Sequence, residues 1–272
     1  MADLPVIGAA LTLKELANFR EWILERDRDL EIQSFHESRV LDADWQPLVD
    51  EAHRLLDGYN GRLGIHGPFW GFAVDSYDPM IRRVVQTRFH QGLDACEKLG
   101  ATHMVIHSPF TTWDYNDLDQ TPGERARKFE NTHLTLTPIV KRAEDLGVML
   151  VMENIEDRDP HDRLELCETF GSAALRLSVD TGHAEYARGH TGAPPVDYFI
   201  RQAGEMLGHV HLQDADGYAD RHWAIGEGTI RWPSVFAEIA RLTVKPRLVL
   251  ELKRARDIPK SMDYLAGLGL GQ

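Results

Sequence analysis

The chain has few cysteines and no long apolar run, and each shortage excludes a class of protein. Only two of its 272 residues are cysteine, Cys96 and Cys167, and they fit neither a disulfide framework nor a zinc-thiolate site. No apolar stretch reaches the roughly 18 residues of a membrane-spanning helix, and no secretory leader is evident. We therefore expect a soluble cytoplasmic protein without a membrane partner.

Basic residues are outnumbered by acidic ones. The chain has 30 Lys and Arg residues against 43 Asp and Glu residues, which gives a formal net charge of -13. A field of that sign repels phosphate backbones, although a local basic patch could still bind them. We therefore expect a small, uncharged or weakly charged substrate and no nucleic-acid partner.

The glycines form no phosphate-binding loop. The run Gly226-Glu227-Gly228 is too short, and lies in the wrong context, for a dinucleotide or P-loop motif. No linker or change of composition divides the chain. We therefore predict a single domain over residues 1–272.

Short apolar runs recur along the chain, and an amphipathic stretch follows most of them. We predict strands at residues 5–10, 30–35, 62–66, 103–107, 148–153, 176–180, 209–212 and 248–251. Examples of the helical patterns between them are residues 13–26, 45–56, 81–99, 124–146 and 197–207. Eight strand-then-helix units in one chain of this length predict the α/β class, as a single closed (β/α)8 TIM barrel rather than an open sheet.

Six consecutive predicted strands end on groups that can bind metal. These groups are His66, His107, Glu153, Asp180 with His183 close behind, His211 and Glu251. Since side chains alternate along a strand, four can point inward at one height: Glu153, Asp180, His211 and Glu251. Four ionisable groups are costly in an interior that branched apolar side chains normally fill, unless a cation or a hydrogen-bond network compensates. Three carboxylates and one imidazole suit Mn²⁺, Mg²⁺, Co²⁺ or Zn²⁺.

Other polar and aromatic residues near these strand ends have an ordinary structural explanation beside a functional one. His36 follows strand two and could reach the rim, whereas His209 lies one layer below His211 and is expected to pack. The loops also carry aromatic side chains that suit the C–H faces of a sugar or simply pack: Trp70, Phe110, Trp113 and Trp223.

Three segments resemble the xylose isomerase-like TIM barrel superfamily, which also contains endonuclease IV. They are Glu153-Asn154, the run Val-Asp-Thr-Gly-His at 179–183, and the segment from His211 through Asp220-Arg221-His222 to Ile230. The resemblance runs from strand two to strand eight. It specifies the superfamily but not the reaction, since members share a metal site and differ in chemistry.

The resemblance implies two alternative sets of metal ligands. Sugar isomerases and epimerases hold one ion, for which the matching positions are Glu153, Asp180, His211 and Glu251. Endonuclease IV-like members hold three zinc ions, for which the matching positions are His66, His107, Glu153, Asp180, His183, His211, Asp220, His222 and Glu251. We favour one bound divalent ion, and the ligand set would permit up to three. The acidic chain argues against a nuclease, because gripping a bent duplex calls for positively charged loops.

One departure concerns the ketose 3-epimerases of the superfamily. They usually carry an arginine shortly after the strand-seven histidine, at the position that Gly217 holds here, and Arg221 lies further on. This departure argues against a 3-epimerase but not against isomerase chemistry in general.

We therefore expect a divalent-metal-dependent isomerase or epimerase that acts on a sugar, keto-sugar or cyclitol through a metal-stabilised enediolate. Glu153 and Glu251 would transfer the proton. His66, His107, His183, Asp220 and His222 would bind substrate or additional metal. A lyase or dehydratase with the same metal site and a trinuclear-zinc hydrolase remain as alternatives, and a homo-oligomer stays open.

Overall fold

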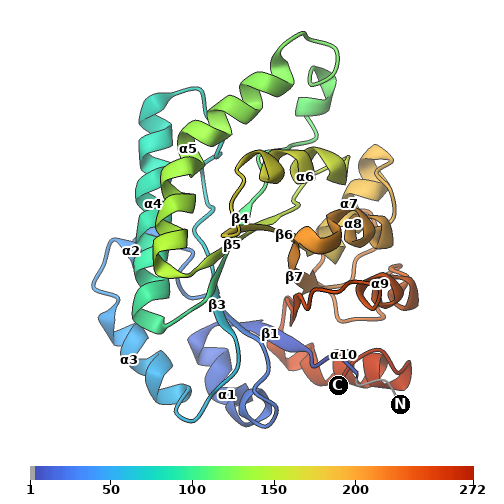
Figure 1. The fold of residues 1–272 in the computed structure, drawn as a ribbon. Coiled ribbons are helices and arrows are strands. Elements are labelled where there is room, and N and C mark those ends of the chain that lie inside the picture. The colour runs from blue at the N-terminus through green and yellow to red at the C-terminus, as the bar shows by residue number, and fades with distance from the viewer. Residues whose placement is uncertain (1–3) are drawn as a thin grey trace.

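Eight parallel strands close into a barrel in the computed structural model, which describes residues 4–272 (Figure 1). The strands are β1 (Gly8–Leu11), β2 (Leu30–Ile32), β3 (Leu63–His66), β4 (His103–His107), β5 (Met149–Glu153), β6 (Leu175–Asp180), β7 (Leu207–Leu212) and β8 (Arg247–Leu250). They follow one another in chain order, and β8 pairs with β1. The predicted TIM barrel is confirmed.

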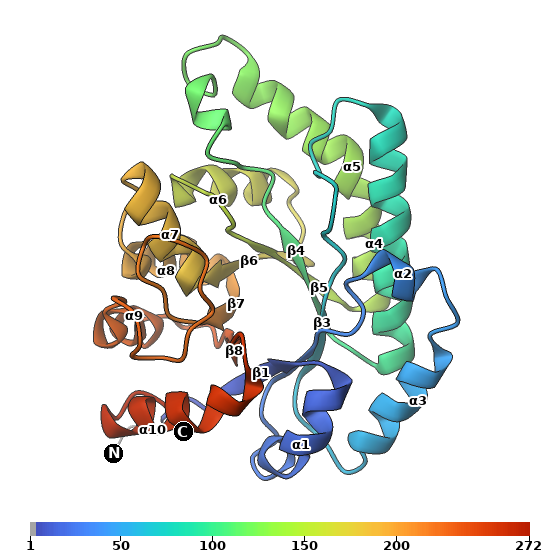
Figure 2. The same ribbon diagram turned by 180° about the vertical axis from the view of Figure 1, so that it is seen from behind.

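Helices surround the strands on the outside (Figures 1 and 2). They are α1 (Leu13–Leu24), α2 (Ser38–Leu41), α3 (Gln46–Leu55), α4 (Pro79–Leu99), α5 (Glu124–Leu146), α6 (Pro160–Thr169), α7 (Thr181–Thr191), α8 (Val196–Ala203), α9 (Trp232–Ile239) and α10 (Ile258–Gly267). The two longest, α4 and α5, pack along each other. Each of these two ends at a glycine in the left-handed region, Gly100 at φ +69° and Gly147 at φ +68°, because only glycine adopts that conformation without strain.

The structure moves some of the predicted boundaries. Strand β2 ends at Ile32 rather than at residue 35, because Ser34 leaves the ladder and its hydroxyl accepts the Leu13 N–H at 3.1 Å. The predicted helix 197–207 ends early, since Gly204 takes φ +48° and ψ -132°, outside the helical region.

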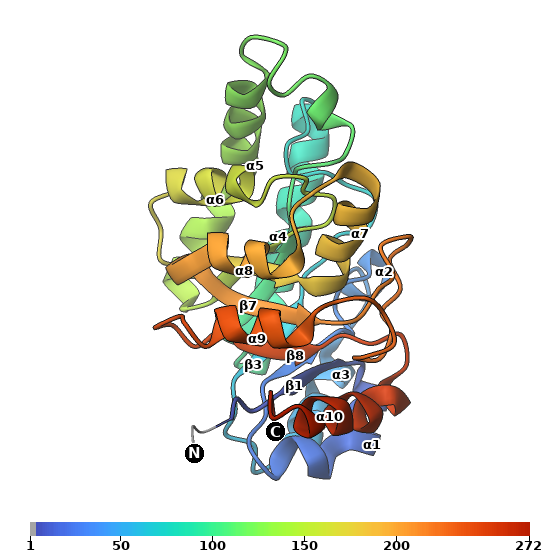
Figure 3. The ribbon, with the colours of Figure 1, turned by 90° about the vertical axis from the view of Figure 1, so that its right-hand side faces the viewer.

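The first described residues lie beside the C-terminus (Figure 3). The Ile7 N–H donates to the Gln272 carbonyl at 2.9 Å, and the Gln272 N–H donates to the Pro5 carbonyl at 3.0 Å. The guanidinium of Arg28 donates to the carbonyls of Ile7 and Gln272, each at 2.9 Å. None of the helices within residues 4–272 is long and apolar enough to cross a membrane.

A polar layer interrupts the apolar interior of the barrel. Glu31, His103 and His209 lie there with no exposed surface. Gly64 stands beside Glu31 and His103 in the register of β2, β3 and β4. A Cβ at Gly64 would lie 1.8 Å from Cε1 of His103, so the absence of a side chain at Gly64 makes room for that ring.

Gly64→Ala is expected to destabilise the fold, since the His103 ring would have to move. Overpacking of this kind costs about 1–3 kcal/mol of unfolding free energy, which urea denaturation measures. The matched control is Gly267→Ala at the end of α10, where a Cβ meets nothing within 4 Å; this variant should unfold at the same urea concentration or slightly higher. Wild-type stability of Gly64→Ala would contradict the packing argument.

Candidate metal centre

Four predicted ligands meet at the carboxyl end of the barrel. Glu153, Asp180 and His211 lie on β5, β6 and β7, and Glu251 directly follows β8. Asp180 and His211 face each other in the register of β6 and β7. The Nδ1 atom of His211 lies 2.8 Å from Oε1 of Glu153, 3.5 Å from Oε2 of Glu251 and 4.0 Å from Oδ2 of Asp180. All four side chains are buried.

The chemistry of this group fits a divalent cation. One ligand atom from each of the four residues lies within 4.8 Å of the others. Among the described residues, Oε2 of Glu153 and Oδ2 of Asp180 are buried and have no hydrogen-bond partner. Since unpaired buried carboxylate oxygens are costly, a cation between them would stabilise the arrangement. Oxygen-rich ligation with one imidazole suits Mn²⁺, Mg²⁺, Co²⁺ or Zn²⁺.

The start of helix α7 holds Asp180 in place. Its Oδ1 atom caps the helix by accepting the His183 N–H at 2.7 Å, and it also accepts Nε2 of Gln213 at 3.1 Å. The side-chain amide of Asn154 makes two hydrogen bonds with the Asp180 backbone. It accepts the Asp180 N–H at 2.9 Å and donates to the Asp180 carbonyl at 3.0 Å. These bonds occupy Oδ1 and leave Oδ2 directed at the centre.

Two histidines flank the centre on the side of β3 and β4. The Nε2 atoms of His66 and His107 lie 3.8 Å and 3.6 Å from Oε2 of Glu153. Phe69 covers both rings, with centroid distances of 4.8 Å to His66 and 4.4 Å to His107. Burial lowers the pKa of His107 to about 3, so this imidazole is neutral and free to bind a hydroxyl or a metal ion.

A second group flanks the centre on the other side. Nε2 of His183 lies 3.5 Å from Oδ2 of Asp220, and Nε2 of His222 lies 3.1 Å from Oδ1 of Asp220. His222 sits at φ +49°, a conformation that non-glycine residues rarely adopt and that often marks a functional site. Burial alone would lower the pKa of His222, but the contact with Asp220 and the nearby carboxylates raise it to about 9.

The loop after β7 is held by a buried carboxylate. Asp214 accepts the Gly226 N–H at 2.8 Å and the Trp232 indole N–H at 2.9 Å, and its backbone pairs with that of Trp223. Gly228 packs against this anchor, and a Cβ there would lie 2.2 Å from the Ala215 carbonyl oxygen. The Gly-Glu-Gly run thus anchors the loop that carries Asp220 and His222.

Burial and neighbouring charges shift the pKa values of the buried acids and histidines in opposite directions. Burial raises the pKa of Asp180 to about 6. Burial alone would lower the pKa of His211, but the surrounding carboxylates, Glu251 first among them, raise it well above its usual range. Burial would raise the pKa of Glu153, but His211 lowers it. Asp180 and His211 therefore bind protons more tightly than usual, and a metal ion has to compete with these protons.

Sequence reasoning missed three polar residues around the centre. Glu31 lies below His211 with its Oε1 atom 3.1 Å from Nε2. Gln33 donates to Oε1 of Glu251 at 2.5 Å, and Gln213 donates to Asp180 and Asp220 at 3.1 Å and 3.2 Å. The alternation Glu31-Ile32-Gln33 carried a signal for the first two, since both polar residues share one strand face.

The predicted aromatic residues occupy different environments. Trp70 and Trp113 are 67% and 78% exposed, whereas Phe110 is 1% exposed and packs in the core. Trp223 is half-buried, with the Arg221 guanidinium 5.0 Å above its ring. Phe69 is the aromatic residue that contacts His66 and His107. His36 reaches the rim, where its ring lies 5.5 Å from that of Phe69 and 6.2 Å from that of His66.

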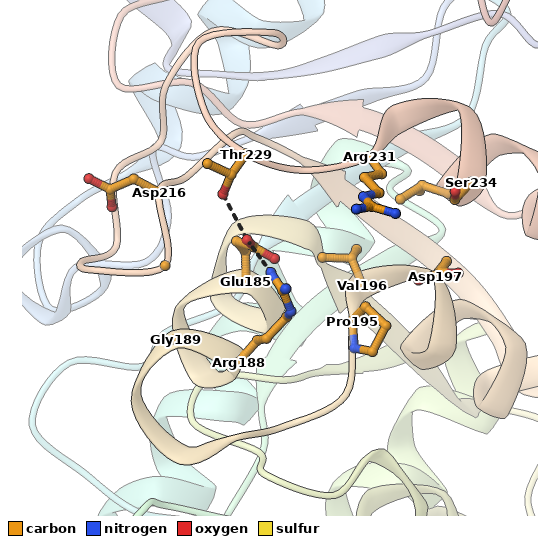
Figure 4. A pocket seen from close by; sticks show the side chains of 12 residues that line it. Glu185, Arg188, Gly189, Pro195, Val196, Asp197, Asp216, Thr229, Arg231 and Ser234 are labelled. Atoms are coloured by element: carbon orange, nitrogen blue, oxygen red, sulfur yellow. Dashed lines mark hydrogen bonds and ion pairs between the residues drawn. The ribbon is translucent and has the colours of Figure 1, made fainter.

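One cavity adjoins the metal centre, and a larger one lies outside the barrel. The larger, of about 800 Å³, opens outside the barrel between α7, α8 and α9 and contains none of the predicted ligands. Figure 4 shows Glu185 in it, bonded to Arg188 and Thr229. The smaller cavity, of about 150 Å³, borders His107 and is lined by Phe69 and other apolar side chains. Of these two, the smaller one adjoins the metal centre.

Comparison with known proteins places these observations in a family. The model of the xylose isomerase-like TIM barrel family matches residues 29–268. A D-tagatose 3-epimerase-like structure is similar with TM-score 0.77 and 23% identity, over 96% of each chain. The TTHB071 protein of Thermus thermophilus, solved after soaking with ZnCl₂, gives TM-score 0.74 and 28% identity over 98% of this chain and 99% of that one. A D-psicose 3-epimerase of Enterocloster bolteae is 23% identical over 68% of this chain and 60% of its own.

Metal binding at the centre is expected to release protons. The pKa of His211 is raised well above its usual range, so this imidazole holds a proton near neutral pH that it must lose to bind an ion. Affinity for Zn²⁺ should therefore rise with pH across the neutral range. Calorimetry in buffers of different ionisation enthalpy counts the released protons. An affinity that does not change between about pH 6 and about pH 8 would contradict this expectation.

Proposed function

The chain belongs to the xylose isomerase-like TIM barrel family, and on that premise we propose that it is a divalent-metal-dependent isomerase or epimerase of a sugar, keto-sugar or cyclitol. The convergence of Glu153, Asp180, His211 and Glu251 carries the proposal. The similar D-tagatose 3-epimerase-like structure and the related D-psicose 3-epimerase support a sugar as substrate.

Two glutamates are placed to move the proton. Glu153 and Glu251 approach Nδ1 of His211 from different strands, at 2.8 Å and 3.5 Å, so a substrate bound there has a carboxylate on either side. One carboxylate removes the proton from the carbon next to the carbonyl or hydroxyl, and the other, or the same one, returns it. A bound divalent ion would supply the Lewis acid that stabilises the negative charge of the enediolate.

The flanking imidazoles and the loop carboxylate bind the remaining hydroxyls. His66 and His107 stand on one side of Glu153, and His183 with Asp220 and His222 stands on the other. Phe69 covers the first pair, and its ring offers an apolar face to the C–H groups of a sugar.

The loop after β7 argues against a ketose 3-epimerase but not against an isomerase or another epimerase. Gly217 occupies the position where the 3-epimerases that the chain resembles usually carry an arginine. Arg221 is engaged elsewhere, since its guanidinium donates to Asp216 at 2.9 Å and lies above Trp223. We therefore propose an isomerase or epimerase without assigning the carbon atom that reacts.

The two flanking groups favour a second candidate, a trinuclear-zinc hydrolase. His66 and His107 form one potential ion site with Glu153, which the central group shares, and His183, Asp220 and His222 form another. The formal net charge of -13 opposes a nucleic-acid substrate in this case too.

Metal content separates the two candidates. We expect one tightly held ion per chain, because the central group alone combines four buried ligands. Elemental mass spectrometry of protein purified without chelator gives the number, and anomalous diffraction gives the position. Asp180→Asn should remove that ion, whereas His222→Gln should leave it bound. Three zinc ions that include His66 and His222 among their ligands would contradict the isomerase and favour the hydrolase.

Glu153→Gln and Glu251→Gln should each lower turnover by at least about 10²-fold, the lower range for general acid–base catalysis. A panel of aldoses, ketoses and cyclitols in D₂O, followed by NMR, detects both the product and deuterium incorporated at the reacting carbon. The matched control is Glu51→Gln on α3, which removes the charge of an exposed ion pair with Arg54 and should retain activity.

Circular dichroism checks that both site variants keep the fold. Wild-type turnover in both glutamine variants would contradict the proposed proton transfer. A dehydrated product from the wild-type protein would instead assign a lyase to the same centre.

A further inference from the structure

A buried carboxylate lies directly beneath the metal centre. Glu31 on β2 has no exposed surface, and three imidazoles surround it. Its Oε1 atom lies 3.1 Å from Nε2 of His211, and its Oε2 atom lies 3.4 Å from Nε2 of His209 and 3.6 Å from Nε2 of His103. Glu31 is therefore the link between the lower polar layer and the centre above it.

His211 has a separate carboxylate partner at each ring nitrogen. Nδ1 faces the centre, 2.8 Å from Glu153, whereas Nε2 faces Glu31. A neutral imidazole carries one proton, and the nitrogen without the proton is the one that can bind a metal ion. An ionised carboxylate only accepts hydrogen bonds, so a proton on Nε2 satisfies Glu31 and leaves the Nδ1 lone pair directed at the centre.

We propose that Glu31 is a positioning residue for His211, which keeps the proton on Nε2 and so selects Nδ1 as the metal-binding nitrogen. The inference rests on the metal centre of the proposed function and extends it to a residue that is not one of the four predicted ligands and that contacts one of them, His211. A carboxylate behind a metal-binding histidine also increases the basicity of the ligand, and the loss of such a partner commonly weakens metal binding.

Two histidines of the lower layer lie beside the oxygen of Glu31 that does not face His211. His209 and His103 confine this oxygen from β7 and β4. Gly64 leaves the space that the His103 ring occupies. Both histidines lie nearest Oε2, whereas Oε1 is the oxygen that faces His211.

Glu31→Gln tests the proposal, because a glutamine has the same size but no charge and can donate to Nε2 as well as accept from it. We expect the dissociation constant for Zn²⁺, measured by competition with a chromophoric chelator, to rise by about 10–100-fold. In wild-type protein loaded with Zn²⁺, NMR of ¹⁵N-labelled histidine should show His211 protonated at Nε2 and metal-bound at Nδ1. At a pH high enough to deprotonate metal-free His211, a larger share of that ring should carry its proton on Nδ1 in the variant than in the wild type.

Ser178→Ala is the matched control. It removes a buried hydrogen bond to His209 in the same layer but leaves Glu31 and its contact with His211 in place, so its Zn²⁺ affinity should match that of the wild type. Thermal unfolding of both metal-free variants separates a loss of stability from a loss of affinity, because a purely structural role for Glu31 would lower stability alone.

Several outcomes would overturn the inference. Wild-type Zn²⁺ affinity in Glu31→Gln would do so, as would a wild-type His211 that binds zinc through Nε2. Anomalous diffraction that places an ion among Glu31, His103 and His209 would make Glu31 a ligand instead. Wild-type protein that binds none of Mn²⁺, Mg²⁺, Co²⁺ and Zn²⁺ would overturn both this inference and the proposed function. If Glu31→Gln weakens Zn²⁺ binding as expected but the wild-type protein turns over no sugar, only the proposed function is overturned.

Discussion

The polar interior of this barrel depends on the two contacts that the imidazole of His211 makes with buried carboxylates. The ring lies between Glu153 above and Glu31 below, at 2.8 Å and 3.1 Å, and thereby joins two layers of charged side chains in an interior that apolar residues otherwise fill. Buried carboxylates are stable only with partners. One histidine supplies a partner to both layers, and the charges therefore form a connected network.

The surrounding backbone keeps this network rigid. Asp180 is both a centre residue and the cap of α7, and Asn154 holds its peptide group from the neighbouring strand. Asp214 anchors the long loop that brings Asp220 and His222 over the centre. The ligands at strand ends are thus positioned by the ladder, whereas those on the loop depend on one buried carboxylate. Such support is what a metal site needs to hold its geometry.

The residues of the centre fit the ligand sets of the two proposed functions. Its four central ligands suit a single ion that assists proton transfer, whereas the flanking groups extend the same ligand set toward three ions. Glu153 belongs to both arrangements, since its two oxygens face different groups. This sharing explains how one barrel mouth could support either sugar isomerisation or hydrolysis with few changes in the loops.

The sequence by itself determined the barrel and the four central residues. Alternating strand and helix patterns indicated eight repeats, and period-two alternation placed Glu153, Asp180, His211 and Glu251 at the strand ends, because both signals are local along the chain. Only the tertiary structure decided which distant residues support them. Glu31 lies 180 positions from His211, and no local pattern shows that β2 and β7 face each other across the barrel or that Gly64 makes room for His103. Such contacts arise from closure of the barrel, which brings strands together that are remote in the chain.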